Sequence, residues 1–110
     1  MEVNWADFTK IEMRVGTILT AENFAEVKKP AYKMTIDFGE FGIRKTSAQI
    51  TKLYKPEDLI GKQIVAVLNF PPKQIANMMS ECLVLGGVEG EGKVILLQPD
   101  HKVENGTRVN

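Results

Sequence analysis

The sequence predicts an all-β protein, either a barrel or a sandwich of short strands. Runs rich in Val, Ile, Thr and Phe recur at intervals of about ten residues, which is typical of these folds. Turn signals containing glycine separate the runs, and they occupy residues 38–42, 59–63, 86–93 and 104–107. A chain of 110 residues predicts a single domain, spanning residues 1–110.

The first three predicted strands follow one another closely. Residues 14–24 place β-branched side chains among threonines. Residues 33–38 alternate between apolar and polar side chains, which predicts that one face of this strand points into a core. Residues 43–48 follow after a short turn flanked by glycines, so the second and third strands are expected to pair as neighbours.

The later strands, over residues 63–70, 81–87 and 93–99, are apolar on both faces. A strand of this kind needs a covering layer on each side. One face fills the interior of a small barrel, and a chain of this length has few helices with which to cover the other. We therefore predict a homodimer, in which outer strand faces or terminal segments are shared between the two copies.

Helical segments are predicted to be brief. Residues 4–11 begin with Asn4, a favoured N-cap residue. Pro56 occupies a favourable first helical position, with acidic residues after it. Residues 47–54 predict a helical turn or two, and residues 71–79 predict a single turn. Helical segments between the third and fourth strands of a five-stranded Greek-key barrel are the arrangement of an OB-fold.

The charge of the chain is balanced but unevenly distributed. Fourteen basic and fourteen acidic residues give a formal net charge of zero, which argues against nucleic-acid binding by bulk charge. Residues 41–56 nevertheless contain Arg44, Lys45, Lys52 and Lys55 and no acid. This basic segment is interpreted either as a solvated strand face or as a functional patch that pairs with phosphates or with acidic peptide groups.

Signals of catalysis are weak. The single cysteine, Cys82, forms no internal disulfide, and one histidine, His101, is too little for a zinc site. A small buried hydrophobe is the favoured interpretation of Cys82, and a nucleophilic cysteine is the alternative. No phosphate-loop, nucleophile-elbow or zinc-protease motif occurs. We therefore predict that the protein is no enzyme and has no catalytic residue, no metal and no cofactor.

The chain also lacks targeting signals. No run approaches 18 consecutive apolar residues, and the amino terminus has no apolar segment of the kind found in signal peptides. We expect a cytoplasmic protein with no membrane insertion.

Residues 68–87 form an unusual connection. Pro71 and Pro72 cannot donate backbone hydrogen bonds, so they end the preceding strand and stiffen its exit. Met78 and Met79 follow, and methionine suits surfaces that accept varied apolar partners. The alternative is that both methionines fill gaps inside the barrel or in a dimer.

Three further segments are informative together, namely residues 11–18, 47–87 and 94–109, with "SAQIT", "NFPP" and "SE-LVLGG" as the most specific motifs. These segments resemble the CsaA-type, export-related chaperones, which lie within the wider family of tRNA-binding domains. The wider family usually has a lysine where this chain has Pro71 and a glycine where it has Cys82. It usually reads Ser-Gly-Ile where this chain has "SAQI" over residues 47–50. These departures favour the chaperone branch over strong tRNA binding.

The resemblance implies an OB-fold barrel with terminal extensions, a homodimer, and non-catalytic binding of unfolded or precursor polypeptides linked to protein export. Export machinery is an implied further partner, and tRNA affinity is implied by kinship. The alternative function is that of a tRNA-binding accessory protein of the same fold. The salt dependence of binding discriminates the two, because phosphate contacts weaken steeply with salt.

The residues expected to contact a peptide or RNA ligand fall into three chemical groups. Apolar contacts are expected from Phe70, Pro71, Met78 and Met79. Charge steering is expected from Arg44, Lys45, Lys52 and Lys73. Ordering hydrogen bonds are expected from Ser47, Gln49, Ser80 and Glu81.

Overall fold

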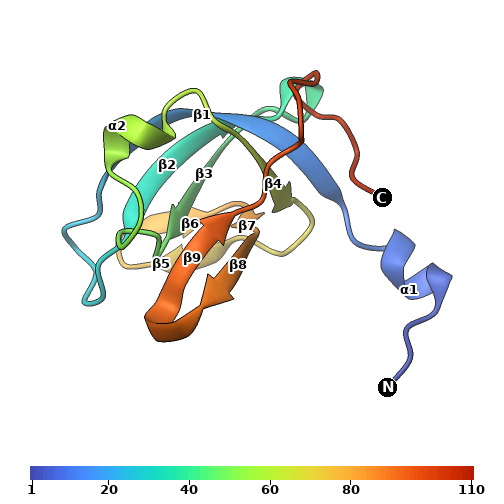
Figure 1. Ribbon diagram of the computed structural model, residues 1–110, viewed down its shortest axis with the longest axis horizontal. Coiled ribbons are helices and arrows are strands. Elements are labelled where there is room, and N and C mark those ends of the chain that lie inside the picture. Colours follow the sequence, from blue (N-terminus) through green and yellow to red (C-terminus); the bar gives the residue numbers. More distant parts are fainter.

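A computed structural model describes residues 1–110, and it has the architecture of an OB-fold (Figure 1). Five strands form one antiparallel sheet in the order β3-β2-β1-β4-β7, which curves into a nearly closed barrel. Their bounds are β1 Met13–Asn23, β2 Tyr32–Asp37, β3 Ile43–Ala48, β4 Gln63–Val67 and β7 Leu83–Val84. The predicted fold class, an all-β OB-fold barrel with short helices, is confirmed.

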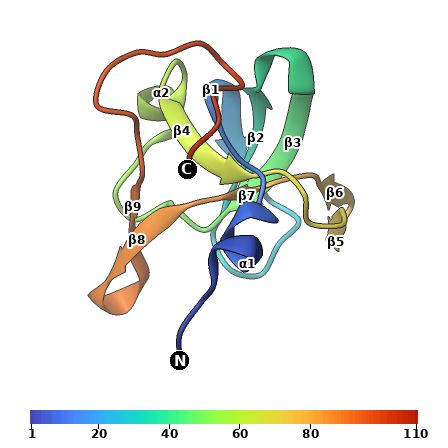
Figure 2. The same ribbon diagram turned by 90° about the vertical axis from the view of Figure 1, so that its right-hand side faces the viewer.

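Two small hairpins lie outside this sheet. They consist of β5 Lys73–Ile75 with β6 Met78–Ser80, and of β8 Gly86–Glu89 with β9 Lys93–Leu96. Two 3₁₀ turns, η1 Gly39–Phe41 and η2 Gly90–Gly92, connect β2 to β3 and β8 to β9. Figure 2 shows β7 between the two hairpins, with β5–β6 on one side and β8–β9 on the other.

The interior of the barrel is filled from the central strands. The alternation predicted for residues 33–38 is confirmed, since Met34, Ile36 and Phe38 are buried. Strand β4 is buried on both faces, as its two-sided apolar pattern predicted. Gly16 of β1 is required here, because a Cβ atom at this position would lie 2.6 Å from the ring of Phe38.

The two helices are short, and both follow their local signals. Helix α1, Trp5–Thr9, is capped by Asn4, whose Oδ1 accepts a hydrogen bond from the backbone N–H of Asp7 at 2.8 Å. Helix α2, Pro56–Leu59, begins at the predicted proline. No helix of the chain has the length and apolar character of a membrane span.

The carboxy-terminal residues return to the barrel and lie along β1 (Figure 1). The backbone of Val15 donates to Thr107 and accepts from Gly106, at 2.9 and 2.8 Å. The side chain of Gln63 donates to the carbonyl oxygen of Val103 at 2.7 Å, and Thr17 Oγ1 donates to Asn105 Oδ1 at the same distance. The carboxy-terminal segment therefore covers an edge of β1, while α1 projects away from the barrel.

Three local predictions are wrong. Residues 71–79 form no helical turn: they make the β5–β6 hairpin, in which Ala76 adopts a left-handed φ of +51°. Residues 47–54 form no helix, because β3 continues to Ala48 and a turn follows at residues 51–53. The predicted strand 81–87 is divided between β7 and β8, since the chain leaves the barrel at Leu85 to enter the second hairpin.

Candidate ligand groove

A groove of about 620 Å³ opens where β3 and β7 diverge. One wall consists of the end of β3, with Ser47, Ala48 and Gln49. The β5–β6 hairpin supplies Lys73, Ile75 and Ser80, and the β8–β9 hairpin supplies Val88 and Val94. Ten of the seventeen lining residues are hydrophobic, so the floor of the groove suits apolar side chains.

A second hollow of about 270 Å³ adjoins the groove and shares Lys73, Ser80, Cys82 and Leu83 with it. Its remaining lining residues are Phe70 and Pro71, at the exit of β4. Phe70 is 57% exposed, so its ring is free to contact a ligand. The two hollows together bring six of the predicted contact residues to one surface, namely Ser47, Gln49, Phe70, Pro71, Lys73 and Ser80.

The groove is positively charged. Lys28, Lys29 and Lys73 line it, and no acidic residue does. Lys28 and Lys29 come from the loop between β1 and β2. Their place opposite β3 depends on the barrel bringing distant segments together, so the candidate residues chosen from the sequence did not include them. The groove also has no aromatic residue in its lining.

Hydrogen bonds fix the wall formed by β3. The backbone N–H of Glu81 donates to the carbonyl oxygen of Lys45 at 2.8 Å, and the N–H of Lys45 donates to Glu81 Oε1 at 2.9 Å. Thr46, which is buried, donates through Oγ1 to the carbonyl oxygen of Cys82 at 2.8 Å and lies 3.1 Å from Ser80 Oγ. Glu81 and Ser80 therefore tie β3 to the segment that follows the first hairpin.

Arg44 takes part in the same attachment. Its guanidinium donates to the carbonyl oxygens of Leu68 and Glu81, at 2.9 and 3.3 Å, and its side chain is partly buried. It lines none of the hollows described here. The donors of Arg44 are thus directed at the protein backbone.

The remaining predicted contact residues lie away from the groove. Lys45 and Met78 line a separate polar hollow of about 260 Å³ on the other side of the first hairpin. Met79 is 43% exposed and lines neither hollow. Lys52 contacts the carbonyl oxygen of Glu91 through Nζ, at the tip of the second hairpin. The basic segment and the methionine pair therefore share a surface only at this polar hollow, which both Lys45 and Met78 line.

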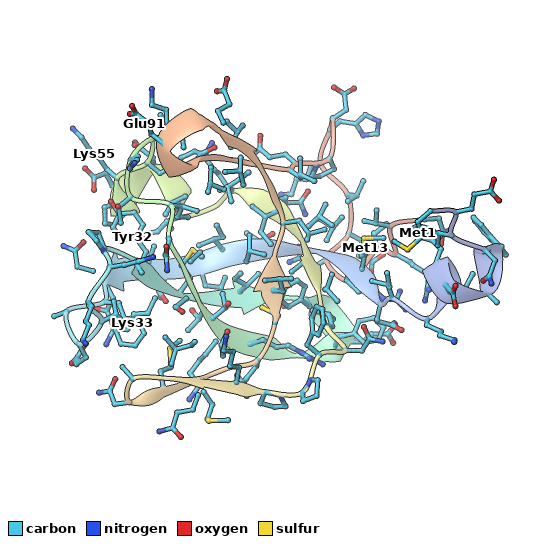
Figure 3. The ribbon with its side chains drawn as sticks, turned by 90° about the horizontal axis from the view of Figure 1, so that it is seen from below. Met1, Met13, Tyr32, Lys33, Lys55 and Glu91 are labelled. Atoms are coloured by element: carbon cyan, nitrogen blue, oxygen red, sulfur yellow. The ribbon has the colours of Figure 1, made fainter.

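The contact made by Lys52 joins the loop that follows β3 to the tip of the second hairpin. Figure 3 shows Glu91 on the same side of the molecule as Lys55, which lies in the loop that carries Lys52. This loop is anchored from below, because Tyr32 Oη donates to the carbonyl oxygen of Tyr54 at 2.7 Å. Tyr54 Oη in turn accepts from the N–H of Leu96 at 3.1 Å. The second hairpin is thus held beside the loop that follows β3.

Cys82 is buried, as predicted. Burial raises the pKa of the thiol to about 11, and the hydrogen bond from Thr46 and the charge of Arg44 oppose this shift only in part. The neutral thiol therefore dominates near neutral pH, and a neutral thiol is a poor nucleophile. His101 lines a different hollow, beside Lys62, so the two residues make no common site.

Comparisons with known proteins identify the family. Residues 13–108 match the model described as "Putative tRNA binding domain". The chain is 54% identical to the CsaA chaperone of Bacillus anthracis, with a TM-score of 0.96 and full coverage of both chains. For the CsaA chaperone protein of Picrophilus torridus the identity is 51% and the TM-score 0.92, with coverage of 99% and 100%.

Relatives of a second kind are methionine–tRNA ligases. The chain is 35% identical to the enzyme of Methanococcoides burtonii over 108 residues, which cover 98% of this chain and 16% of the ligase. The chain therefore spans only about a sixth of the length of these relatives. The match over residues 13–108 places the chain in the family of tRNA-binding domains, in which its CsaA-like structure is shared with proteins described as chaperones.

Proposed function

We propose that this protein is a non-catalytic chaperone that holds extended segments of unfolded or precursor polypeptides in the groove between β3 and β7. The composition of the groove carries this proposal. Its lining combines apolar side chains with three lysines and contains neither an acid nor an aromatic ring. Such a surface suits a polypeptide with apolar and acidic side chains, whereas single-stranded nucleic acid is usually held by stacking on aromatic residues.

The similarity to two CsaA chaperones supports the proposal, because it covers at least 99% of each chain. The resemblance to export-related chaperones leads us to link its clients to protein export, and we expect the protein to act in the cytoplasm. The neutral thiol of Cys82 favours binding over catalysis.

tRNA binding is the second candidate function. It is favoured by the family model and by the ligase relatives, whose matched part corresponds to this domain. The exposed side chain of Lys45 and the lysines of the groove supply positive charge for phosphates. Arg44 and Lys52 contribute less, because both already donate to backbone carbonyl oxygens.

We also propose a homodimer. Trp5 of α1 is 70% exposed, and its ring lies beside that of Phe8 at a centroid distance of 5.4 Å. Leu97, just beyond the second hairpin, is 46% exposed and offers further apolar surface. A second copy would cover such surface. Light scattering at micromolar concentration is expected to give the mass of a dimer, and a monomer alone would refute this part of the proposal.

The two candidate functions are separated by a competition experiment across salt concentrations. A fluorescent, reduced and carboxymethylated polypeptide is bound first, and tRNA is then added as competitor. Peptide affinity that rests on apolar contacts is expected to change little with salt, whereas a protein contacting about six phosphates would lose roughly a thousandfold in tRNA affinity between low and moderate salt. Tight, salt-sensitive tRNA binding without polypeptide binding would overturn the chaperone proposal.

A further inference from the structure

The barrel has an open seam between β3 and β7, which are not neighbours in the sheet. Near one end of this seam, the backbone N–H of Glu81, just before β7, donates a hydrogen bond to the carbonyl oxygen of Lys45 in β3. Beyond it the strands diverge, and the groove occupies the space between them. Figure 2 shows β7 passing between the two hairpins.

The direction in which the backbone N–H and C=O groups of Ser47 point can be inferred from the hydrogen bonds of Lys45. In an antiparallel pair, the N–H and C=O groups of a residue both point to the same side, and successive residues alternate sides. Both backbone groups of Lys45 bond to Glu81, away from β2. Ser47, two residues further along β3, therefore directs its N–H and C=O away from β2 as well, into the groove.

These backbone groups are nearly unused. The carbonyl oxygen of Ser47 accepts only a long contact from Thr46 Oγ1, at 3.4 Å, and no backbone hydrogen bond joins Ser47 to β7. A free strand edge of this kind is a template for an added strand. The lining of the groove then selects the occupant, since Lys28, Lys29 and Lys73 favour acidic side chains and the apolar floor favours apolar ones.

We propose that a client segment with alternating acidic and apolar residues binds as an added β-strand along the Ser47 edge of β3. This inference rests on the proposed chaperone function and specifies how the client is held. Backbone hydrogen bonds are independent of sequence, so they would let one groove accept many clients. The lysines and the apolar floor would then rank the clients by composition.

A scan of backbone methylation tests this mode of binding. The probe is a short synthetic peptide in which aspartate and leucine alternate, and each amide nitrogen is methylated in turn. Because both backbone groups of Lys45 already bond to Glu81, Ser47 is the residue of β3 left to exchange hydrogen bonds with an added strand. Methylation is therefore expected to weaken binding about tenfold at the peptide amide opposite Ser47 and to leave the adjacent amides unchanged. The adjacent amides are the matched controls.

The outcomes separate this inference from the function on which it rests. Equal binding of the unmethylated peptide and of every methylated one would overturn the added strand and leave the chaperone function standing. Failure of the unmethylated peptide to bind, with binding of a single-stranded RNA oligonucleotide instead, would overturn both.

A protein variant gives a second measurement. Ser47→Pro removes an N–H that the sheet does not use, and edge strands tolerate proline at such positions. We expect about a tenfold loss of peptide affinity with the thermal unfolding transition retained. Unchanged affinity in the folded variant would contradict the proposal, and the methylation scan on the wild-type protein decides the matter if the variant does not fold.

Discussion

The two sides of the barrel differ in how completely they are closed. On the closed side, which comprises β1, β2, β4 and the carboxy-terminal segment, Ile18, Ile36 and Ile64 have no exposed surface. On the open side, which comprises the seam and the two hairpins, Leu83 is 49% and Val88 71% exposed. The closed side supplies most of the buried apolar surface and therefore most of the stability. The open side keeps apolar surface and backbone groups available for a partner.

The largest effect is expected from a core substitution on the closed side. Phe38→Ala removes a fully buried ring and is expected to cost about 3–5 kcal/mol of unfolding free energy. Val88→Ala on the open side is expected to cost within about 0.5 kcal/mol, because Val88 is largely exposed. Chemical denaturation of both variants measures the difference. Equal losses of unfolding free energy would show that the closed side does not supply most of the stability.

A smaller loss of stability is expected from a substitution at Glu81, whose side chain holds β3 to the segment after the first hairpin. Glu81→Ala removes the acceptor of the Lys45 N–H, and we expect a loss of about 1 kcal/mol in stability. Affinity for the alternating peptide should fall as well, because β3 loses one of the hydrogen bonds that hold it at the groove. Glu81→Gln keeps a carbonyl oxygen at this position and is the control. Equal losses in the two variants would mean that the negative charge matters, not the hydrogen bond.

The charge of the open side is expected to contribute less. Lys73→Ala should weaken binding of the alternating peptide by up to about fivefold at low salt, since exposed charge pairs contribute about 0.2–1 kcal/mol. The loss should shrink at high salt because exposed charges are screened. Lys62→Ala, which lies outside the groove, is the matched control. Fluorescence anisotropy at two salt concentrations measures both variants, and equal losses would argue against steering by the groove.

The smallest effect concerns the attachment of the carboxy-terminal segment. The hydrogen bond from Arg14 lowers the pKa of the Glu12 carboxyl group. Desolvation opposes this shift, and the positive charge of Arg108 adds to it. A lowered pKa in the folded state stabilises the protein above the unfolded value of 4.5 and loses this contribution as the pH falls through the folded value. Glu12→Gln should therefore flatten the dependence of stability on pH below 4.5.

Acid titration of thermal unfolding for the wild type and Glu12→Gln checks this expectation. The two curves should converge at low pH, where Glu12 is protonated in the wild type. Parallel curves through the acidic range would indicate that Glu12 does not hold the carboxy-terminal segment by its charge.

Elements with local signals could be predicted from the sequence, and those that depend on distant partners could not. Asn4 and Pro56 mark the two helices because a cap and a first-turn proline act within a few residues. The β5–β6 hairpin was missed because its strands are only three residues each and its turn has Ala76 in place of glycine.

The same distinction applies to the groove. Ser47, Lys73 and Phe70 were chosen from unusual local sequence, and the fold places them on one surface. Lys28 and Lys29 were left out because only the closing of the barrel brings their loop opposite β3. Arg44 appeared in the sequence as a free cation, whereas its partners are carbonyl oxygens 24 and 37 residues away.

The central claim is that the open seam binds extended polypeptide, and mapping of amide chemical shifts tests it most directly. A reduced, carboxymethylated polypeptide would be added to isotopically labelled protein. We expect changes in chemical shift concentrated at Ser47, Gln49, Lys73 and Val84, with the closed side unaffected. Changes confined to other surfaces, or none at saturating polypeptide, would contradict it.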